Sequence, residues 1–114
     1  MDVLKALYNI NSKSGREGEI KRFFLQQLAD LQLNIEEDEI GNLFITKGKA
    51  KKYPCVTAHL DEVHEESPYR VVEDSFRIFG EDEQGCMTGI GADDKNGLWI
   101  ILRLLELWNI CCHN

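Results

Sequence analysis

Apolar residues recur every three or four positions in the first third of the chain, which is the spacing of one face of an α-helix. Residues 2–10 carry a short face of this kind, and residues 17–31 carry a longer one. The longer face consists of Ile20, Phe23, Phe24, Leu28 and Leu31. Just before it, Ser14 and Glu17 have the spacing of a capping box, in which each side chain accepts a hydrogen bond from a backbone N–H. The pattern predicts two amphipathic helices, the second packed on a sheet.

The spacing changes from helical to extended after residue 33. Residues 34–40 and 42–47 are two short runs separated by Gly41, so they predict a β-hairpin whose acidic first strand lies near an edge. The next run, residues 54–60, is small, apolar and β-branched, which is typical of a strand buried on both faces of a sheet.

Two polar segments, residues 63–75 and 80–91, read as loops that flank a short predicted strand at residues 76–79. Strands that alternate with helices predict an α/β fold, here a layered α/β/α arrangement around a mixed sheet. A chain of 114 residues accommodates one such domain, residues 1–114.

The last predicted helix, residues 94–108, has almost no polar face. Its large apolar residues are Leu98, Trp99, Ile100, Ile101, Leu102, Leu104, Leu105, Leu107 and Trp108. A helix that is apolar on nearly every side requires burial on nearly every side. We therefore expect a homo-oligomer formed through this helix, with Leu105, Leu107 and Trp108 near the contact.

Composition excludes several classes of partner. The net charge is −7, so no basic stripe is available for a nucleic acid, and the short run of lysines between residues 47 and 52 reads as a solvated turn. No apolar run reaches the roughly 18 residues that span a bilayer, and the first residues lack the pattern of a signal peptide. We expect a cytoplasmic protein that binds neither nucleic acid nor membrane, with its four cysteines reduced.

The first segment with candidate chemistry is His59-Leu60-Asp61, at the end of the predicted buried strand. Residues two apart on a strand point to the same face, so the two polar side chains can lie side by side. A neutral imidazole is a zinc ligand, and a neighbouring carboxylate fixes its orientation and raises its basicity. A purely structural histidine at a strand end is the alternative.

The second segment is Gly89-Ile90-Gly91-Ala92-Asp93-Asp94-Lys95-Asn96-Gly97, immediately before the apolar helix. Two adjacent carboxylates flanked by glycines suit a loop that faces a cation. They equally suit a helix start, at which Asp93 or Asp94 caps the first backbone N–H groups. The segment alone leaves both interpretations open.

Together, the two segments resemble the co-catalytic two-zinc peptidases that include peptidase T, carboxypeptidase G and the aminoacylases. The run Ser14-Gly15-Arg16-Glu17-Gly18-Glu19 and the run Gly41-Asn42-Leu43 also resemble that family, so the resemblance covers residues 4–107. It implies a zinc-peptidase-like catalytic domain that hydrolyses a peptide or N-acyl amino acid. It also implies a cis peptide bond between Asp93 and Asp94, which relatives commonly contain.

The resemblance also implies the role of each matched residue. His59 would bind one zinc ion, Asp93 would bridge two, and Asp61 would orient His59 and support catalysis. Asp94 would not be a ligand.

Other parts of the family's site have no counterpart here. The family supplies a Glu-Glu pair, which contains the general base and a ligand, then a further acidic ligand and a distant His. Glu65-Glu66 precedes Asp93 and reads as a solvated loop. We therefore expect a truncated, N-terminal part of the catalytic domain that is inactive alone, or a non-catalytic oligomerising module that retains part of the fold.

Overall fold

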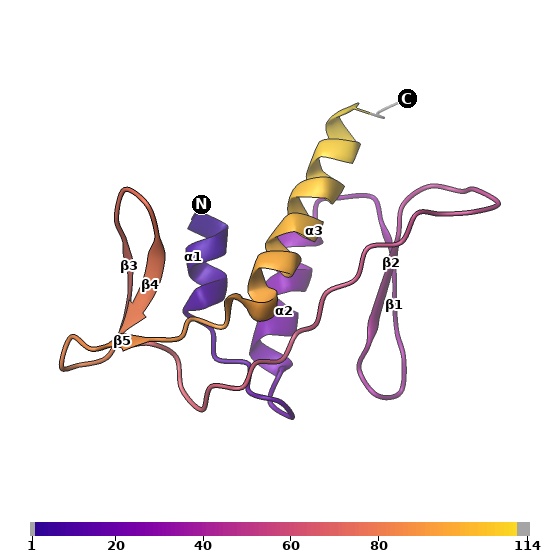
Figure 1. The fold of residues 1–114 in the computed structure, drawn as a ribbon. Helices are drawn as coiled ribbons and strands as arrows, with labels where there is room; N and C mark the ends of the chain where they lie inside the picture. The colour runs from indigo at the N-terminus through magenta and orange to yellow at the C-terminus, as the bar shows by residue number, and fades with distance from the viewer. Residues whose placement is uncertain (1, 112–114) are drawn as a thin grey trace.

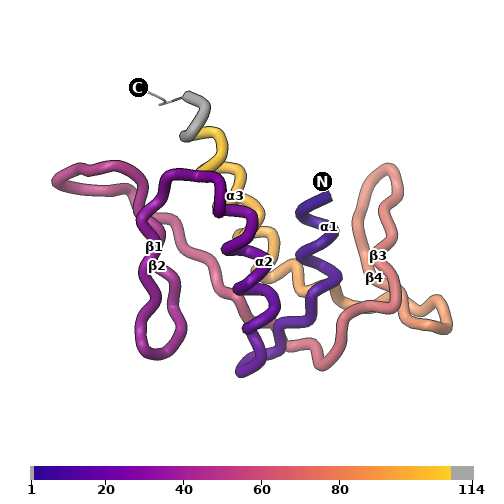
Figure 2. The backbone as a smooth tube through the Cα atoms, turned by 180° about the vertical axis from the view of Figure 1, so that it is seen from behind, coloured from indigo at the N-terminus to yellow at the C-terminus, as the bar shows by residue number. Residues whose placement is uncertain are grey.

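Three α-helices form the centre of the part of the chain that the structure describes. The structure is a computed structural model, and it describes the backbone of residues 2–111 and the side chains of residues 2–108. The helices are α1 (Asp2–Tyr8), α2 (Gly18–Leu28) and α3 (Ala92–Cys111). Figures 1 and 2, which are opposite views, show α2 and α3 packed side by side with α1 next to them. None of the described helices is long and apolar enough to cross a membrane.

The described strands form two small antiparallel sheets on opposite sides of the helices (Figure 1). In the first sheet, β1 (Asn34–Glu37) pairs with β2 (Leu43–Thr46). The second sheet contains β3 (Arg70–Glu73), β4 (Ile78–Glu81) and β5 (Met87–Thr88), in that order. Helices and strands thus combine as an α/β protein, but the predicted layering around one mixed sheet is not confirmed.

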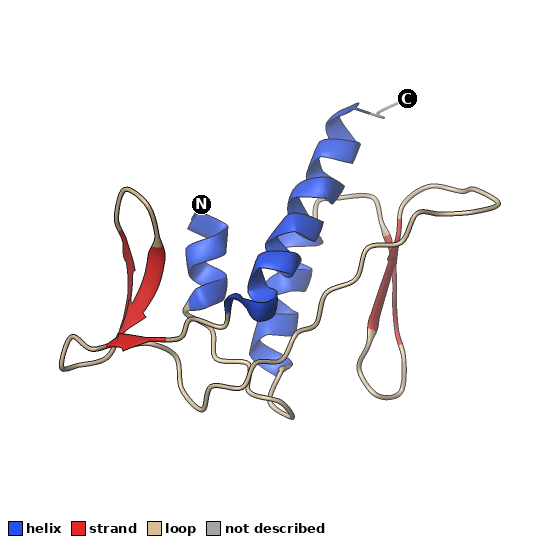
Figure 3. Ribbon diagram, in the orientation of Figure 1, coloured by secondary structure: helices blue, strands red, loops and turns tan. Residues whose placement is uncertain are grey.

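The strand predicted over residues 54–60 is wrong for this structure. These residues form an extended, largely exposed loop that passes the helices, drawn in tan in Figure 3. A central strand requires backbone partners on both sides, and none of the described strands pairs with this segment. Its continuation makes one isolated parallel bridge, between Lys13 and Glu62.

The second sheet also corrects the predicted loop at residues 63–75 and the predicted strand at residues 76–79. Strand β3 lies within that loop, and β4 starts at Ile78. The reason is a turn built by Asp74, whose Oδ1 accepts hydrogen bonds from the backbone N–H of Phe76 at 2.8 Å and of Arg77 at 2.9 Å. This turn places the two strands in register, with Glu73 opposite Ile78.

The hairpin predicted around Gly41 is confirmed. Asp38 builds its turn, because Oδ1 accepts from the backbone N–H of Ile40 at 3.1 Å and of Asn42 at 2.8 Å. Gly41 has a φ of +94°, which glycine adopts without steric strain. Turn-forming residues between two extended runs were therefore enough to predict this hairpin from the sequence.

The capping box predicted for α2 is absent. Glu17 is the residue before the helix and makes no side-chain cap bond. Its carboxylate instead accepts from the backbone N–H of Gly15 at 2.8 Å, while the N–H of Ser14 donates to the backbone oxygen of Glu62 at 3.3 Å. The segment before α2 is thus held by Glu62, which is distant in sequence. A local motif could not indicate this contact.

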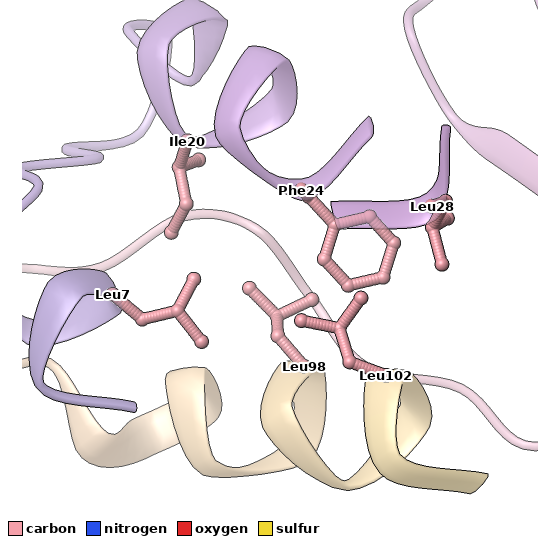
Figure 4. Close-up of a cluster of buried hydrophobic side chains, with 6 residues drawn as sticks. All are labelled: Leu7, Ile20, Phe24, Leu28, Leu98 and Leu102. Carbon is pink, nitrogen blue, oxygen red and sulfur yellow. The ribbon is translucent and has the colours of Figure 1, made fainter. Parts of the chain in front are cut away.

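Six buried apolar side chains join the three helices into one core (Figure 4). They are Leu7, Ile20, Phe24, Leu28, Leu98 and Leu102. Each of α2 and α3 contributes residues four positions apart, so that one stripe of each helix faces the other. This core holds the first half of α3 in place, and with it the segment that begins the helix.

Candidate functional site

The imidazole of His59 is oriented by Asp61. Nδ1 of His59 lies 2.9 Å from the backbone oxygen of Asp61 and 3.2 Å from its Oδ1. Because both oxygens only accept hydrogen bonds, Nδ1 carries the proton and donates it. The predicted side-by-side placement of the two residues is therefore observed, on a loop rather than at the end of a central strand. The other ring nitrogen, Nε2, is left available for a second partner.

That second partner is Asp93. Nε2 of His59 lies 2.8 Å from Oδ1 of Asp93. An ionised carboxylate has no proton to donate, so a hydrogen bond at this distance is donated by a proton on Nε2 of the imidazole. The hydrogen bond to Asp93 is the main cause that raises the pKa of His59. Burial opposes this effect, and the backbone oxygen and the charge of Asp61 add to it.

The structure separates the two adjacent carboxylates. Oδ1 of Asp94 accepts a hydrogen bond from the backbone N–H of Gly97 at 3.0 Å, which is the geometry of a helix cap. A Cβ atom at position 97 would lie 2.4 Å from that oxygen, so the cap depends on the glycine. The peptide bond between Asp93 and Asp94 is cis, as the resemblance implied. Both residues lie within the bounds of α3, but their φ and ψ angles are not helical. The regular helix therefore starts after Asp94, which caps it, and Asp93 faces His59.

The donor types suit zinc, but the present geometry supplies only part of a metal site. Among the described residues, no group of three or more His, Cys, Asp or Glu side chains is placed to hold a metal ion. A tetrahedral zinc ion bonded to an imidazole nitrogen and a carboxylate oxygen holds those two atoms about 3.4 Å apart. The His59–Asp93 contact must therefore widen to admit a metal ion. The side chain of Asp93 is 94% exposed, so neighbouring side chains leave space for this widening.

Two residues that the sequence interpretation did not select lie buried beside the motifs. Nζ of Lys95 lies 3.2 Å from Oε1 of Glu62, and both side chains are almost completely buried. Burial lowers the pKa of Lys95, and the charge of Glu62 partly offsets this effect. No local signal singled them out, because polar residues flank both: Asp61 precedes Glu62, and Asp94 and Asn96 lie on either side of Lys95.

Glu65 belongs to the surface, as predicted. It forms ion pairs with Lys13 and with Arg16, the latter at 3.3 Å. The hydrogen bond from Lys13 is the main cause that lowers the pKa of Glu65. A carboxylate held in this way is a poor proton acceptor near neutral pH, which agrees with its interpretation as part of a solvated loop.

Comparison with known proteins finds partial similarity to aminopeptidases. The chain is similar to a putative aminopeptidase of Acetivibrio thermocellus, with 38% identity over 63 residues, or 54% of this chain and 19% of the relative. It is also similar to glutamyl aminopeptidase of Lactococcus lactis subsp. cremoris, with 37% identity over 65 residues, or 54% of this chain and 18% of the relative. The matches thus span about a fifth of each relative. No family model and no solved structure matches the chain.

Proposed function

We propose that this chain forms part of the catalytic domain of a metal-dependent peptidase of the aminopeptidase or tripeptidase kind. The observation that carries the proposal is the contact of His59 with Asp93, at 2.8 Å across 34 positions of sequence. The partial similarity to two aminopeptidases supports the same class of reaction. The proposal includes zinc-peptidase-like layering around one mixed sheet for the complete domain.

In this proposal each residue of the site has one role. His59 would hold one zinc ion through Nε2, Asp93 would hold two through its carboxylate, and Asp61 orients the imidazole by accepting from Nδ1–H. When bound, zinc would supply the acidified water and the polarisation of the carbonyl that hydrolysis of a peptide or N-acyl amide requires. The chain's own contribution is to fix Nδ1–H on Asp61, so that Nε2 is the ring nitrogen aimed at the carboxylate of Asp93.

The chain alone is expected to bind zinc weakly and not to hydrolyse peptides. A catalytic zinc ion keeps three protein ligands, and activation of its water requires a proton acceptor. His59 and Asp93 provide two ligands. Isothermal titration of the 114-residue chain with zinc tests the site, with His59→Ala as the comparison. Equal zinc binding by both proteins contradicts the proposal, and metal-dependent peptide hydrolysis by the pure chain contradicts the expected inactivity.

A second candidate function is a non-catalytic module that self-associates. The observation that favours it is a stripe of half-exposed apolar side chains on α3: Ile100, Leu104, Leu107 and Trp108. The zinc titration separates the two candidates, because a pure scaffold does not bind the metal at His59. Both candidates suit the cytoplasm, where exposed thiols such as those of Cys55 and Cys86 remain reduced.

A further inference from the structure

A buried ion pair lies close in sequence to both candidate ligands. The side chains of Lys95 and Glu62 are only 2% and 3% exposed. Lys95 follows Asp93 by two positions, and Glu62 follows His59 by three. Two charges removed from water are tolerated only when their polar atoms are paired and hydrogen-bonded, so the surroundings of this pair are informative.

The pair meets that requirement through the loop between α1 and α2. Nζ of Lys95 donates to the backbone oxygen of Ile10 as well as to Glu62. Oε1 of Glu62 also accepts from Nδ2 of Asn11 and from the backbone N–H of Ser12, each at 3.0 Å. One buried carboxylate oxygen thus receives three donors from two other segments.

Backbone hydrogen bonds also join the loop between α1 and α2 to the segment of Glu62. The N–H of Glu62 donates to the oxygen of Ser12 at 2.9 Å, and the N–H of Ser14 donates to the oxygen of Glu62 at 3.3 Å. The N–H of Lys95 donates to the oxygen of Gly91 at 3.2 Å. Residues 10–14 therefore hold the segment of His59 on one side and, through Lys95, the segment of Asp93 on the other.

Gly91 closes the arrangement. Its φ is +68°, and a Cβ atom there would lie 1.8 Å from Oε2 of Glu62 and 3.1 Å from Cε of Lys95. The backbone just before Asp93 thus rests directly on the ion pair, with no space for a side chain.

We propose that the Glu62–Lys95 ion pair positions His59 and Asp93 for metal binding, as a pair of positioning residues rather than ligands. This inference rests on the proposed zinc site. Hydrogen bonds between fixed donors and acceptors define both distance and direction, whereas an apolar contact at the same place permits sliding. Loss of the pair therefore misaligns the ligands even where the helical core still holds the fold.

The test uses the full chain and removes the charges without changing the volume. Lys95→Met alone leaves a buried, unpaired carboxylate and is expected to destabilise the fold. Combined with Glu62→Gln, it removes both charges, and the new amide oxygen still accepts from Ser12 and Asn11. Glu62→Gln alone is the milder variant: it leaves the ammonium of Lys95 without a charge partner, but the new amide oxygen and the backbone oxygen of Ile10 still accept from Nζ. The matched control is Lys21→Met with Glu37→Gln, which removes an ion pair of 2.7 Å between α2 and β1.

Two measurements are made on each folded variant: zinc affinity by titration, and the ring nitrogen signals of His59 in the metal-free protein by long-range ¹H–¹⁵N NMR. We expect the double variant to lose about 10- to 100-fold in zinc affinity, the usual effect of removing a group that orients a ligand. We also expect its His59 signals to move toward those of a free imidazole, while the control keeps both wild-type readings.

Wild-type affinity and wild-type His59 signals in the folded double variant overturn the inference. Loss of the folded state in both the double and the milder variant also overturns it, because the pair then holds the whole fold rather than the site. If the wild-type chain binds no zinc, the proposed function fails. The NMR signals of His59 still decide the positioning role in that case.

Discussion

Nε2 of His59 lies 2.8 Å from Oδ1 of Asp93, and Nδ1 of the same ring is committed to Asp61. Nδ1 donates its proton to Asp61, and Nε2 faces the carboxylate of Asp93. The Nε2 side of the ring therefore accommodates a cation. In the metal-free chain that cation is a proton, and in the proposed site it is a zinc ion. Proton and metal therefore compete for one atom.

The first prediction concerns pH and stability. The folded state raises the pKa of His59 above its ordinary value of about 6.5, chiefly through Asp93. The resulting stabilisation is fully present below the unfolded-state pKa and is lost as the pH rises through the raised folded-state pKa. We expect the free energy of unfolding of the wild type, relative to His59→Gln, to fall across that window. Urea unfolding at a series of pH values measures it, and a constant difference contradicts it.

The second prediction separates the two adjacent carboxylates. Asp93→Asn removes a candidate zinc ligand, so we expect zinc affinity to fall by at least about tenfold. Asp94→Asn makes the same change of charge one position later, and asparagine still caps a helix, so we expect unchanged affinity and stability. Titration calorimetry on both variants gives the answer. An equal loss in both would indicate a general effect of negative charge.

The third prediction concerns Gly97, which lies within α3 under the carboxylate of Asp94. Helix propensity alone favours Gly97→Ala by about 1 kcal/mol. The contact of 2.4 Å between the new Cβ and Oδ1 of Asp94 displaces the cap, whose loss costs about 0.5–2 kcal/mol. Because the displaced carboxylate also has to find new space, we expect net destabilisation by roughly 1 kcal/mol in denaturant unfolding.

Gly18 provides the matched control, since it begins α2 and a Cβ there meets nothing within 4 Å. We expect Gly18→Ala to stabilise the chain by up to about 1 kcal/mol. If both alanine variants are more stable than the wild type, the cap of Asp94 contributes little.

The fourth prediction compares the two sides of α3. Leu102 is fully buried between α2 and α3, so Leu102→Ala should cost about 2–5 kcal/mol through lost burial and the remaining cavity. Leu104 is half exposed, and Leu104→Ala should cost less than about 1 kcal/mol. Thermal and urea unfolding at low protein concentration measure both. Similar costs would contradict the assignment of the buried face.

The fifth prediction is self-association through the exposed face of α3. Ile100, Leu104, Leu107 and Trp108 lie on one stripe, and each such side chain gains about 1.5–3 kcal/mol when it is fully buried. Leu105 is half-buried and packs against the core. It is therefore a weaker candidate for the contact than the apolar pattern of the sequence indicated. We expect a dimer or larger species by light scattering at micromolar concentration, and dissociation by Leu104→Lys with Leu107→Lys. A monomeric wild type contradicts the prediction.

Local pattern was enough to predict the helices, the first hairpin and the α/β class. The helical spacing of Ile20, Phe24 and Leu28 predicts which face of α2 is buried. The turn at Asp38 depends only on hydrogen bonds to residues up to four positions away. These features depend on the repeat of the backbone and on neighbours in sequence. The resemblance also implied that His59 and Asp93 belong to one site, and the structure places them in contact; their role as zinc ligands stays a prediction.

Tertiary structure decided what depends on partners that are distant in sequence. Residues 54–60 have the composition of a buried strand but pair with none of the described strands, and composition carries no information about pairing. Ser14 and Glu17 have the letters of a capping box, but their bonds go elsewhere because Glu62 holds that segment. The burial of Glu62 with Lys95 follows from three segments meeting in space. Only the folded chain brings those segments together, because each buried charge there is stabilised by donors and acceptors that its own neighbours in sequence do not supply.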